Sequence, residues 1–435
     1  MSSLIVNGGR ELNGKIVPSG NKNSILPMLC ASLVAGEPVT IHNVPDITDA
    51  RKIVAFLQLL GARIEGDIES GTLRIDTRSL VATFDQKSLP SGMRSAVLLL
   101  PGLLHRYGQV TLSEAKGCFL GSREIDPHIA LFVAGGAALN SANGNGSVLS
   151  LPKSGFKAVD LWPDYASVTL TENFLMTAAV AKGTSVLRNA ASEPHVQDLC
   201  RMLVAMGCDI QGIGTNVLTV TGRSSLTGAD VTVSQDHHEI VTFLALGAIC
   251  GGTLTIGNSV QDQFPLMDRC FQKLGVNIEH AGEESTVRAN QSLEVERPFT
   301  ANMMQKIEGA PWPYFPVDLL PPMMALATRC QGEVLFWNKV YEGAFFWLPE
   351  MAKFGALSFL ADPHRAIVFG NRPLHAATVD APYIIRAAVA LMMIALSVPG
   401  KSVIQNADPI RRAHPQFIEK LRSLGADISW SGSAE

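Results

Sequence analysis

The chain has 435 residues, of which 47% are hydrophobic and 17% are charged, and its formal net charge is -4. This size supports two or three globular cores, and the lack of lysine–arginine runs argues against a nucleic-acid partner. No apolar stretch is long enough to cross a bilayer, and the seven cysteines are scattered without a CxxC pair. We therefore expect a cytoplasmic protein with reduced thiols, no membrane contact and no zinc site.

One sequence phrase recurs six times along the chain. In each copy, a helix-like apolar pattern ends at a glycine and is followed by a strand-like alternating pattern. Its glycines lie 68 to 80 residues apart by subtraction of their positions, and they are Gly61, Gly136, Gly207, Gly275, Gly355 and Gly425. A second phrase alternates with the first, at Gly36, Gly108, Gly183, Gly252, Gly332 and Gly400. At each of these glycines we expect a helix to end in the left-handed conformation that glycine tolerates.

The interleaved phrases predict six similar units, each with the order strand, helix, strand, helix, strand. One or two such junctions are common in any α/β protein, but two sets in step at one period indicate a repeat. Six units exceed one core, so we expect two lobes of three. Polar segments at 18–23 and 234–239 are the places where we expect the chain to cross from one lobe to the other. This gives one lobe of 22–234 and a second of 1–21 with 235–435. The cleft between lobes is the default ligand site.

The stretch AKGCFLGSREIDPHI places Cys118 between Lys116 and Arg123. Nearby cations favour the thiolate form, which makes such a cysteine more reactive than a buried one. The alternative is a small apolar side chain packed in a core. The polar, glycine-containing surroundings favour a functional loop.

The run SQDHHE contains four consecutive residues of types that bind metals, from Asp236 to Glu239. We expect the adjacent histidines to point in different directions, and no further ligand is spaced to complete a site. The sequence therefore predicts a polar hinge here, with no metal and no organic cofactor.

Six phrases spread along the whole chain together resemble the enolpyruvyl transferases. They are SGNKNSILPML, SGMRSAVLLLPGLL, GCFLGSREIDPHI, ASVTLTEN, FPVDL and NADPIRRAHPQFIEKLRSLGADI. The resemblance implies an α/β (α+β) fold of two lobes, an inside-out α/β barrel of six βαβαβ-type repeats, three per lobe around buried helices. It also implies transfer of the enolpyruvyl group from phosphoenolpyruvate to a hydroxyl of a uridine nucleotide, with release of phosphate. The 3-hydroxyl of UDP-N-acetylglucosamine, in peptidoglycan synthesis, is the first acceptor to consider.

The resemblance also implies roles for single residues. Cys118 would protonate or transiently add to phosphoenolpyruvate, and Asp318 would take the proton of the acceptor hydroxyl. Lys22 would act with arginines on the phosphate, where positioned cations stabilise the leaving group. Residues implied in substrate binding are Asn23, Arg94, Arg123, Asp126, His128, Ser167, Val168, Thr169, Arg386 and Arg412. Taken singly, any of these arginines resembles an ordinary surface residue, and Asp318 resembles a helix cap after Pro316.

Three positions depart from the family pattern. Ala344 stands where an arginine helps to clamp the carboxylate of phosphoenolpyruvate, and Ile384 stands where an acid precedes Arg386 by two residues. Thr169 replaces a common glycine of the diphosphate-binding turn. Losing one charged contact costs about 1.5 to 3 kcal/mol. Residues that could compensate are Lys339, Arg372 or Arg411 for the first position, and Asp318 or Asp380 for the second.

These departures leave other functions open. The same chemistry on another acceptor, such as the 3'-hydroxyl of UMP in nucleoside-antibiotic assembly, is one alternative. Enolpyruvylshikimate-phosphate synthesis is disfavoured because that branch does not use the cysteine loop. A non-catalytic nucleotide-binding regulator is a third, but it is weighed against by the joint retention of Cys118, Lys22, Asp318, Arg386 and Arg412.

We predict that Cys118→Ser abolishes or greatly slows turnover, because a serine hydroxyl is a far weaker acid than a thiol flanked by cations. An alkylating epoxide should add its mass at Cys118, as mass spectrometry of the labelled protein would reveal. Full activity of the serine variant would remove the thiol from the mechanism.

Overall fold

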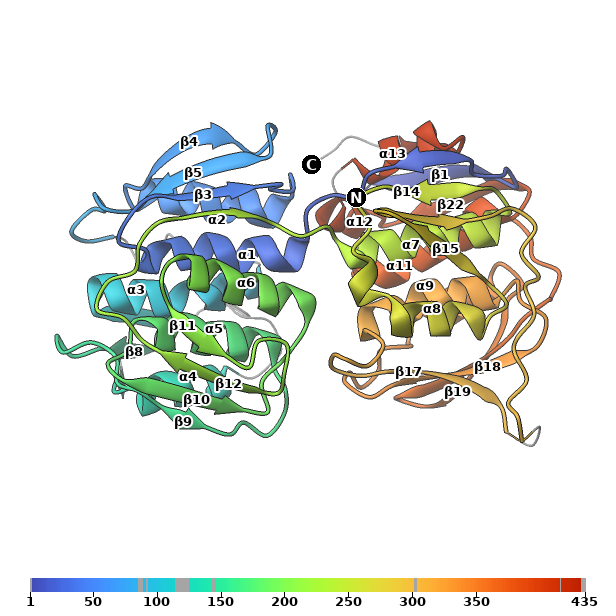
Figure 1. The fold of residues 1–435 in the computed structure, drawn as a ribbon. Helices are drawn as coiled ribbons and strands as arrows, with labels where there is room; N and C mark the ends of the chain where they lie inside the picture. The colour runs from blue at the N-terminus through green and yellow to red at the C-terminus, as the bar shows by residue number, and fades with distance from the viewer. Residues whose placement is uncertain are drawn as a thin grey trace. The chain divides into compact units, whose positions relative to one another are not determined.

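The computed structural model describes residues 2–84, 89–90, 93–113, 125–141, 146–300, 303–414 and 416–431. The chain divides into two compact units, one of Gly20–Ser234 and one that combines Met1–Ser19 with Gln235–Glu435. Within each unit, sheets enclose a layer of helices (Figure 1). Of the helices in the described part of the chain, none has the length and apolar character needed to span a membrane.

Two sheets of the unit 20–234 share one pattern, in which a parallel pair of strands is extended by two antiparallel strands. A third sheet is antiparallel throughout its described strands. The strand orders are β13 (Ala229–Thr232), β3 (Val39–His42), β5 (Thr72–Asp76) and β4 (Arg63–Asp67); β11 (Asp209–Gln211), β12 (Val217–Thr221), β10 (Thr184–Arg188) and β9 (Asp160–Leu161); and β6 (Gln109–Ser113), β8 (Gly146–Ser150) and β7 (Ala138–Ser141).

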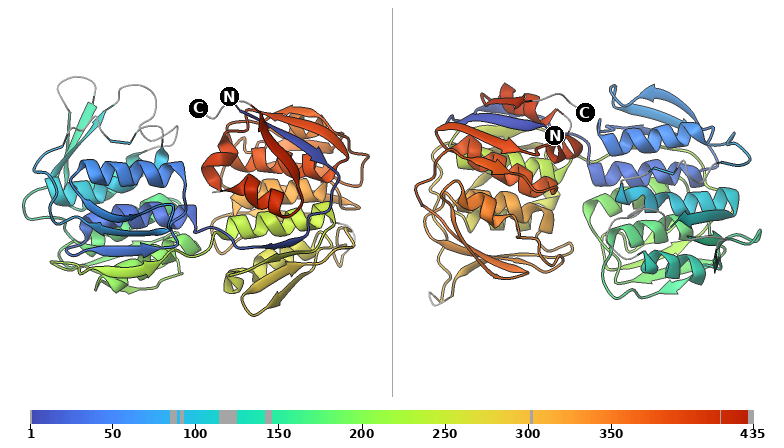
Figure 2. Two further views of the ribbon diagram at one scale, coloured as in Figure 1. Left: turned by 90° about the horizontal axis from the view of Figure 1, so that it is seen from above. Right: turned by 180° about the vertical axis from the view of Figure 1, so that it is seen from behind.

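The three sheets of the second unit all repeat the parallel-then-antiparallel pattern. The N-terminal strand β1 (Ser3–Gly8) lies between two C-terminal strands, as the blue strand among red ones in Figure 2. The orders are β21 (Thr378–Asp380), β22 (Gly400–Gln405), β1 and β23 (Asp427–Ser431); β15 (Ile278–Ala281), β16 (Glu284–Val287), β14 (Leu254–Ile256) and β2 (Gly14–Ile16); and β17 (Gln305–Gly309), β18 (Glu333–Asn338), β20 (Arg365–Phe369) and β19 (Leu357–Asp362).

The helices are of two kinds. Some are apolar on every side and are buried along almost their whole length, such as α7 (His237–Cys250) and α11 (Ile385–Ser397). Others bury a single face against a core, such as α2 (Thr48–Leu59). A helix that is apolar all round must be covered on all sides, which places the first kind at the centre of a unit. The remaining helices are α1 (Lys22–Ala31), η1 (Ser32–Val34), η3 (Arg94–Leu99), α3 (Leu100–Tyr107), α4 (Asp126–Ala134), α5 (Val168–Ala179), α6 (Pro194–Ala205), η4 (Gln261–Gln263), α8 (Pro265–Gln272), η5 (Val317–Leu319), α9 (Leu320–Ala327), α10 (Leu348–Ala352), α12 (Pro409–Ala413) and α13 (Phe417–Ser423).

The six glycines of the first repeated phrase all have positive φ angles, between 74° at Gly275 and 101° at Gly425. Each ends a helix, and the first five are followed by an antiparallel hairpin, for example β4 with β5, whereas Gly425 is followed by β23, which pairs with β1. The repeated phrase predicted a single strand at this point, whereas a hairpin contains two. The shared backbone conformation explains why the glycines recur at a fixed period.

The expectation for the second phrase is wrong at two of its glycines. Gly36 and Gly252 do not have positive φ angles, and the left-handed residue after α7 is Gly251, with φ 84°. Gly252 is small for another reason, since a Cβ there would lie 1.9 Å from the carbonyl oxygen of Leu12. At Gly36 a Cβ would lie 2.6 Å from the carbonyl oxygen of Leu226. Close backbone packing therefore explains these two glycines.

Candidate functional site

Lys22 is the first residue of α1, and Asn21 caps the helix by accepting a hydrogen bond from the backbone N–H of Asn23 at 2.8 Å. Lys22 Nζ lies 3.2 Å from a carboxylate oxygen of Asp49, in the first turn of α2. The two side chains are only 17% and 7% exposed. A helix N-terminus disfavours a cation, so the buried carboxylate of Asp49 holds the ammonium where it would otherwise be repelled.

His128, in the first turn of α4, contacts α5 through both of its ring nitrogens. Asn173 Nδ2 lies 2.9 Å from His128 Nδ1, and Thr169 Oγ1 lies 3.4 Å from His128 Nε2. Because the amide nitrogen of Asn173 can only donate, Nδ1 is the acceptor and Nε2 carries the proton toward Thr169. His128 is 7% exposed, so it supports the start of α5 from beneath.

Asn173 also joins these helices to a third segment. Its side-chain nitrogen lies 3.2 Å from the carbonyl oxygen of Val97 in η3, the helix that begins at Arg94. Asp126 is exposed at the start of α4. Ser167 caps α5, where its hydroxyl accepts from the backbone N–H of Leu170 at 3.4 Å, and Val168 opens the helix. One buried amide therefore gathers three segments that carry predicted substrate-binding residues.

The cysteine loop lies outside the described residues, which resume at residue 125. Cys118 and Arg123, together with the flanking Lys116, belong to it.

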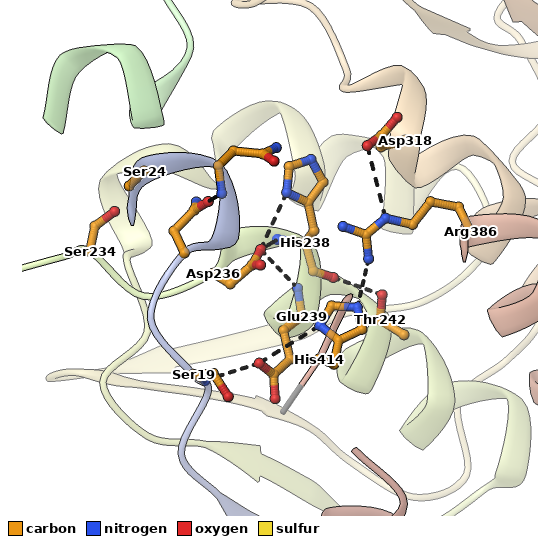
Figure 3. A network of polar contacts seen from close by, with 12 residues as sticks. Ser19, Ser24, Ser234, Asp236, His238, Glu239, Thr242, Asp318, Arg386 and His414 are labelled. Atoms are coloured by element: carbon orange, nitrogen blue, oxygen red, sulfur yellow. Dashed lines mark hydrogen bonds and ion pairs between the residues drawn. The ribbon is translucent and has the colours of Figure 1, made fainter. Parts of the chain in front are cut away.

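Arg386 and Asp318 come together in the second unit (Figure 3). Arg386 lies in the first turn of α11 and Asp318 in η5, and Arg386 Nε is 4.0 Å from Asp318 Oδ2. The arginine side chain is 12% exposed and that of Asp318 is 46% exposed. On its other side, Arg386 Nη1 donates to Nε2 of His414 at 2.6 Å. His414 follows α12, the helix on which the predicted residue Arg412 lies.

A buried acid lies behind His414. Glu239, in the first turn of α7, has an Oε2 atom 3.9 Å from His414 Nδ1, and both side chains are fully buried. Glu239 accepts hydrogen bonds from the backbone N–H of Ser19 at 3.0 Å and from Lys420 Nζ at 2.5 Å. Burial raises the pKa of Glu239, and Lys420 opposes that rise. Burial and the charge of Arg386 lower the pKa of His414 well below its usual value.

The run from Asp236 to Glu239 corrects one expectation. The rings of His237 and His238 do not point apart: their centroids are 4.1 Å from one another, at an interplanar angle of 34°. With Asp236 they form a group whose potential metal-ligand atoms lie within 4.8 Å of one another. However, Asp236 Oδ1 already accepts from the backbone N–H of His238 at 2.8 Å and of Glu239 at 3.4 Å. We assign the carboxylate to capping α7.

Asp236 lies next to His238 at the start of α7 (Figure 3), and it remains ionised there. Burial works against the charged form, but the hydrogen bond and charge of His238 and the charge of Arg386 hold the pKa of Asp236 well below its usual range. The start of α7 therefore contributes negative charge next to the arginine network.

Of the residues considered as substitutes for the missing family groups, Lys339, Arg411 and Asp380 contact other residues and Arg372 is exposed. Ala344 lies half-buried in the turn before α10. Lys339 pairs with Glu308 at 2.5 Å, and the guanidinium of Arg411 lies 3.9 Å from the centre of the Trp430 ring. Arg372 is exposed after β20, and Asp380 accepts a hydrogen bond from Asn406. Asp318 is the candidate that does approach Arg386.

Sequence reasoning missed the residues that support the predicted ones. Asp49, Asn173 and His414 have no diagnostic spacing, and Glu239 was interpreted only as part of a polar hinge. The only sequence signal is that each is a polar residue predicted to be buried, which requires a partner.

The family model for EPSP synthase (3-phosphoshikimate 1-carboxyvinyltransferase) matches residues 6–421. The chain belongs to this family and is an enolpyruvyl transferase by class. Curated relatives named UDP-N-acetylglucosamine 1-carboxyvinyltransferase include those of Borrelia garinii subsp. bavariensis, 36% identical over 98% of this chain and 99% of the relative; Bradyrhizobium diazoefficiens, 37% identical over 98% and 97%; and Bacteroides fragilis, 32% identical over 99% and 100%.

Solved structures share the fold. The enolpyruvyl transferase NikO from Streptomyces tendae matches with a TM-score of 0.86 at 23% identity, covering 100% of both chains. EPSP synthase from Acinetobacter baumannii matches with a TM-score of 0.77 at 16% identity, covering 99% of this chain and 100% of that one. The predicted fold class and the family resemblance are therefore confirmed.

The buried His414 predicts a pH dependence of stability. The unfolded state takes up a proton on this histidine below a pH of about 6.5, whereas the folded state does not, so the free energy of unfolding falls as the pH falls. His414→Gln should remove up to about 1.4 kcal/mol per pH unit from this slope. Urea unfolding of both proteins between about pH 5 and pH 7 measures it. Equal slopes would contradict the neutral state of folded His414.

Proposed function

We propose that the protein transfers the enolpyruvyl group of phosphoenolpyruvate to the 3-hydroxyl of UDP-N-acetylglucosamine and releases phosphate. The observation that carries this proposal is the similarity, over nearly the whole length of both chains, to relatives that bear this activity in their names. We also propose that the reaction serves peptidoglycan synthesis in the cytoplasm. The cysteines in the described residues are all unpaired, which supports a reducing compartment.

The reaction needs an acid, a base and cations. In the addition step, the acceptor oxygen bonds to C2 of phosphoenolpyruvate, C3 gains a proton and the hydroxyl loses one. In the elimination step, C3 loses a proton and phosphate leaves with the electron pair of its bond to C2. Cys118 is our candidate acid and Asp318 our candidate base. The half-exposed carboxylate of Asp318, next to Arg386, supports the second assignment.

The cations act on the phosphate and carboxylate of phosphoenolpyruvate in this proposal. Lys22 and Arg386 are each held by a buried partner, so that their positions are fixed before substrate arrives. Arg94, Arg123 and Arg412 complete the set. Fixed cations stabilise the charge on the departing phosphate without a cost of reorganisation during the reaction.

The nucleotide is assigned to the unit of residues 20–234. The backbone N–H groups at the start of α5, capped by Ser167, suit the diphosphate because helix N-termini attract anions. Asp126 would accept from the N–H of the uracil, and His128 would fix the neighbouring Thr169. Asn23 would bind a sugar hydroxyl.

UMP is a second candidate acceptor, favoured by Thr169. Its side chain stands at the start of α5, where the family commonly has glycine, and is tied to His128. A side chain at this point reduces the space for a diphosphate, which UMP does not carry.

Incubation with phosphoenolpyruvate and one acceptor at a time tests the proposal. We expect phosphate release with UDP-N-acetylglucosamine, and a product whose mass equals that of the acceptor plus the enolpyruvyl group. UMP and 3-phosphoshikimate are the alternative acceptors, and Asp318→Asn, which keeps the shape but not the base, is the variant control. Release with UMP alone would replace the proposed acceptor. Nucleotide binding without any release would instead support a regulator.

A further inference from the structure

The partner of Arg386 is His414, and this contact fixes the protonation state of the imidazole ring. A guanidinium has only donors, so the 2.6 Å contact from Arg386 Nη1 requires His414 Nε2 to be an acceptor. The ring is therefore neutral and carries its proton on Nδ1, the nitrogen that faces Glu239 Oε2 at 3.9 Å. The low pKa of the buried His414 agrees with this state.

The direction of the imidazole is set by packing as well as by Arg386, because Nδ1 has no hydrogen-bond partner among the described residues and only faces Glu239. Its ring lies 4.9 Å from that of Phe417, at an interplanar angle of 31°, and Phe417 packs edge-on against Phe243 at 5.1 Å. Glu239 is held in turn by the backbone N–H of Ser19 and by Lys420. Nothing in this chain of contacts requires His414 to touch a substrate.

Several charged groups around the His414 ring affect its protonation state. Arg386 on α11 and Lys420 on α13 are cations that oppose a further positive charge, and His238 on α7 acts in the same direction. Two acids, Asp236 before α7 and Glu239, act in the opposite direction and favour a protonated ring. Burial then decides the balance in favour of the uncharged ring.

We propose that His414 is a positioning residue for Arg386, which orients the guanidinium as a neutral acceptor and leaves its positive charge available to the anionic substrate. A carboxylate in the same place would orient the guanidinium but would also compete with phosphoenolpyruvate for its charge. Asp318 also approaches Arg386, but at 4.0 Å and from a half-exposed side chain, whereas His414 is fully buried and 2.6 Å away, so the histidine is the partner that fixes the guanidinium. The inference rests on the proposed role of Arg386.

A set of three substitutions tests the proposal through the kinetics with phosphoenolpyruvate and UDP-N-acetylglucosamine. His414→Leu keeps the volume but removes the acceptor, and should raise the KM for phosphoenolpyruvate about 10- to 100-fold with little change in the KM for the nucleotide. His414→Gln supplies a neutral acceptor oxygen and should restore the KM to within about threefold of wild type. A loss of folded protein would lower kcat and leave both KM values unchanged.

The matched control is His280→Leu in the same unit, where His280 binds Asp268 at 2.9 Å and Ser285 at 2.8 Å, away from this network. It should leave the KM for phosphoenolpyruvate unchanged. Wild-type kinetics in His414→Leu, or no rescue by glutamine, would overturn the proposal.

A second measurement separates this inference from the proposed function. Histidine ring 15N spectra of the full chain at neutral pH should show His414 with an unprotonated Nε2, whose resonance shifts in Arg386→Gln. If wild-type protein turns over no substrate, the proposed function fails, but these spectra still decide the orientation of Arg386. A protonated His414 Nε2, or a resonance unchanged in Arg386→Gln, would overturn the inference.

Discussion

In each unit, a cation of the proposed site is held at the N-terminal end of a helix, where the backbone dipole disfavours it. Arg386 lies in the first turn of α11 and Lys22 opens α1. Each has a partner that fixes its position: a neutral imidazole for Arg386 and a buried acid for Lys22. The helix dipole and the cation then act in the same direction on an anion. This arrangement suits a doubly charged phosphate that must bind and then depart.

The supporting groups are buried more deeply than the residues they support. Glu239 and His414 are fully buried, whereas Arg386, which they support, is 12% exposed, and Asp318, proposed to meet the acceptor hydroxyl, is 46% exposed. A buried acid is stable only when it is paired, and Lys420 and the N–H of Ser19 supply the pairing. The same division holds in the unit of residues 20–234, where buried Asn173 supports the starts of α4 and α5.

The fold was predictable from the sequence because its period is repeated. Glycines with positive φ recur at one spacing, and a single misread position cannot hide a pattern of six. Gly36 and Gly252 show the limit, since a close backbone approach and a left-handed turn both call for glycine and cannot be told apart in one sequence. The second hairpin strand was missed because a short strand adds no separate period.

The candidate site was predictable only where phrases resembled a family. Asp318 and Arg386 were identified in that way, but the contact of Arg386 with His414 joins residues that are 28 positions apart, and the contact of His414 with Glu239 spans a greater distance along the chain. Such pairs are set by how helices pack, and no local pattern encodes them. Stacking of His237 on His238 likewise depends on side-chain directions at the first turn of α7.

Calorimetric titration of phosphoenolpyruvate into wild type and Arg386→Gln, with Arg365→Gln as the exposed control, tests the central claim most directly. If the oriented guanidinium of Arg386 binds the anion, affinity should fall at least about tenfold in Arg386→Gln and stay unchanged in the control, which carries its charge in an exposed pair with Asp362. Equal affinity in all three proteins would contradict the account.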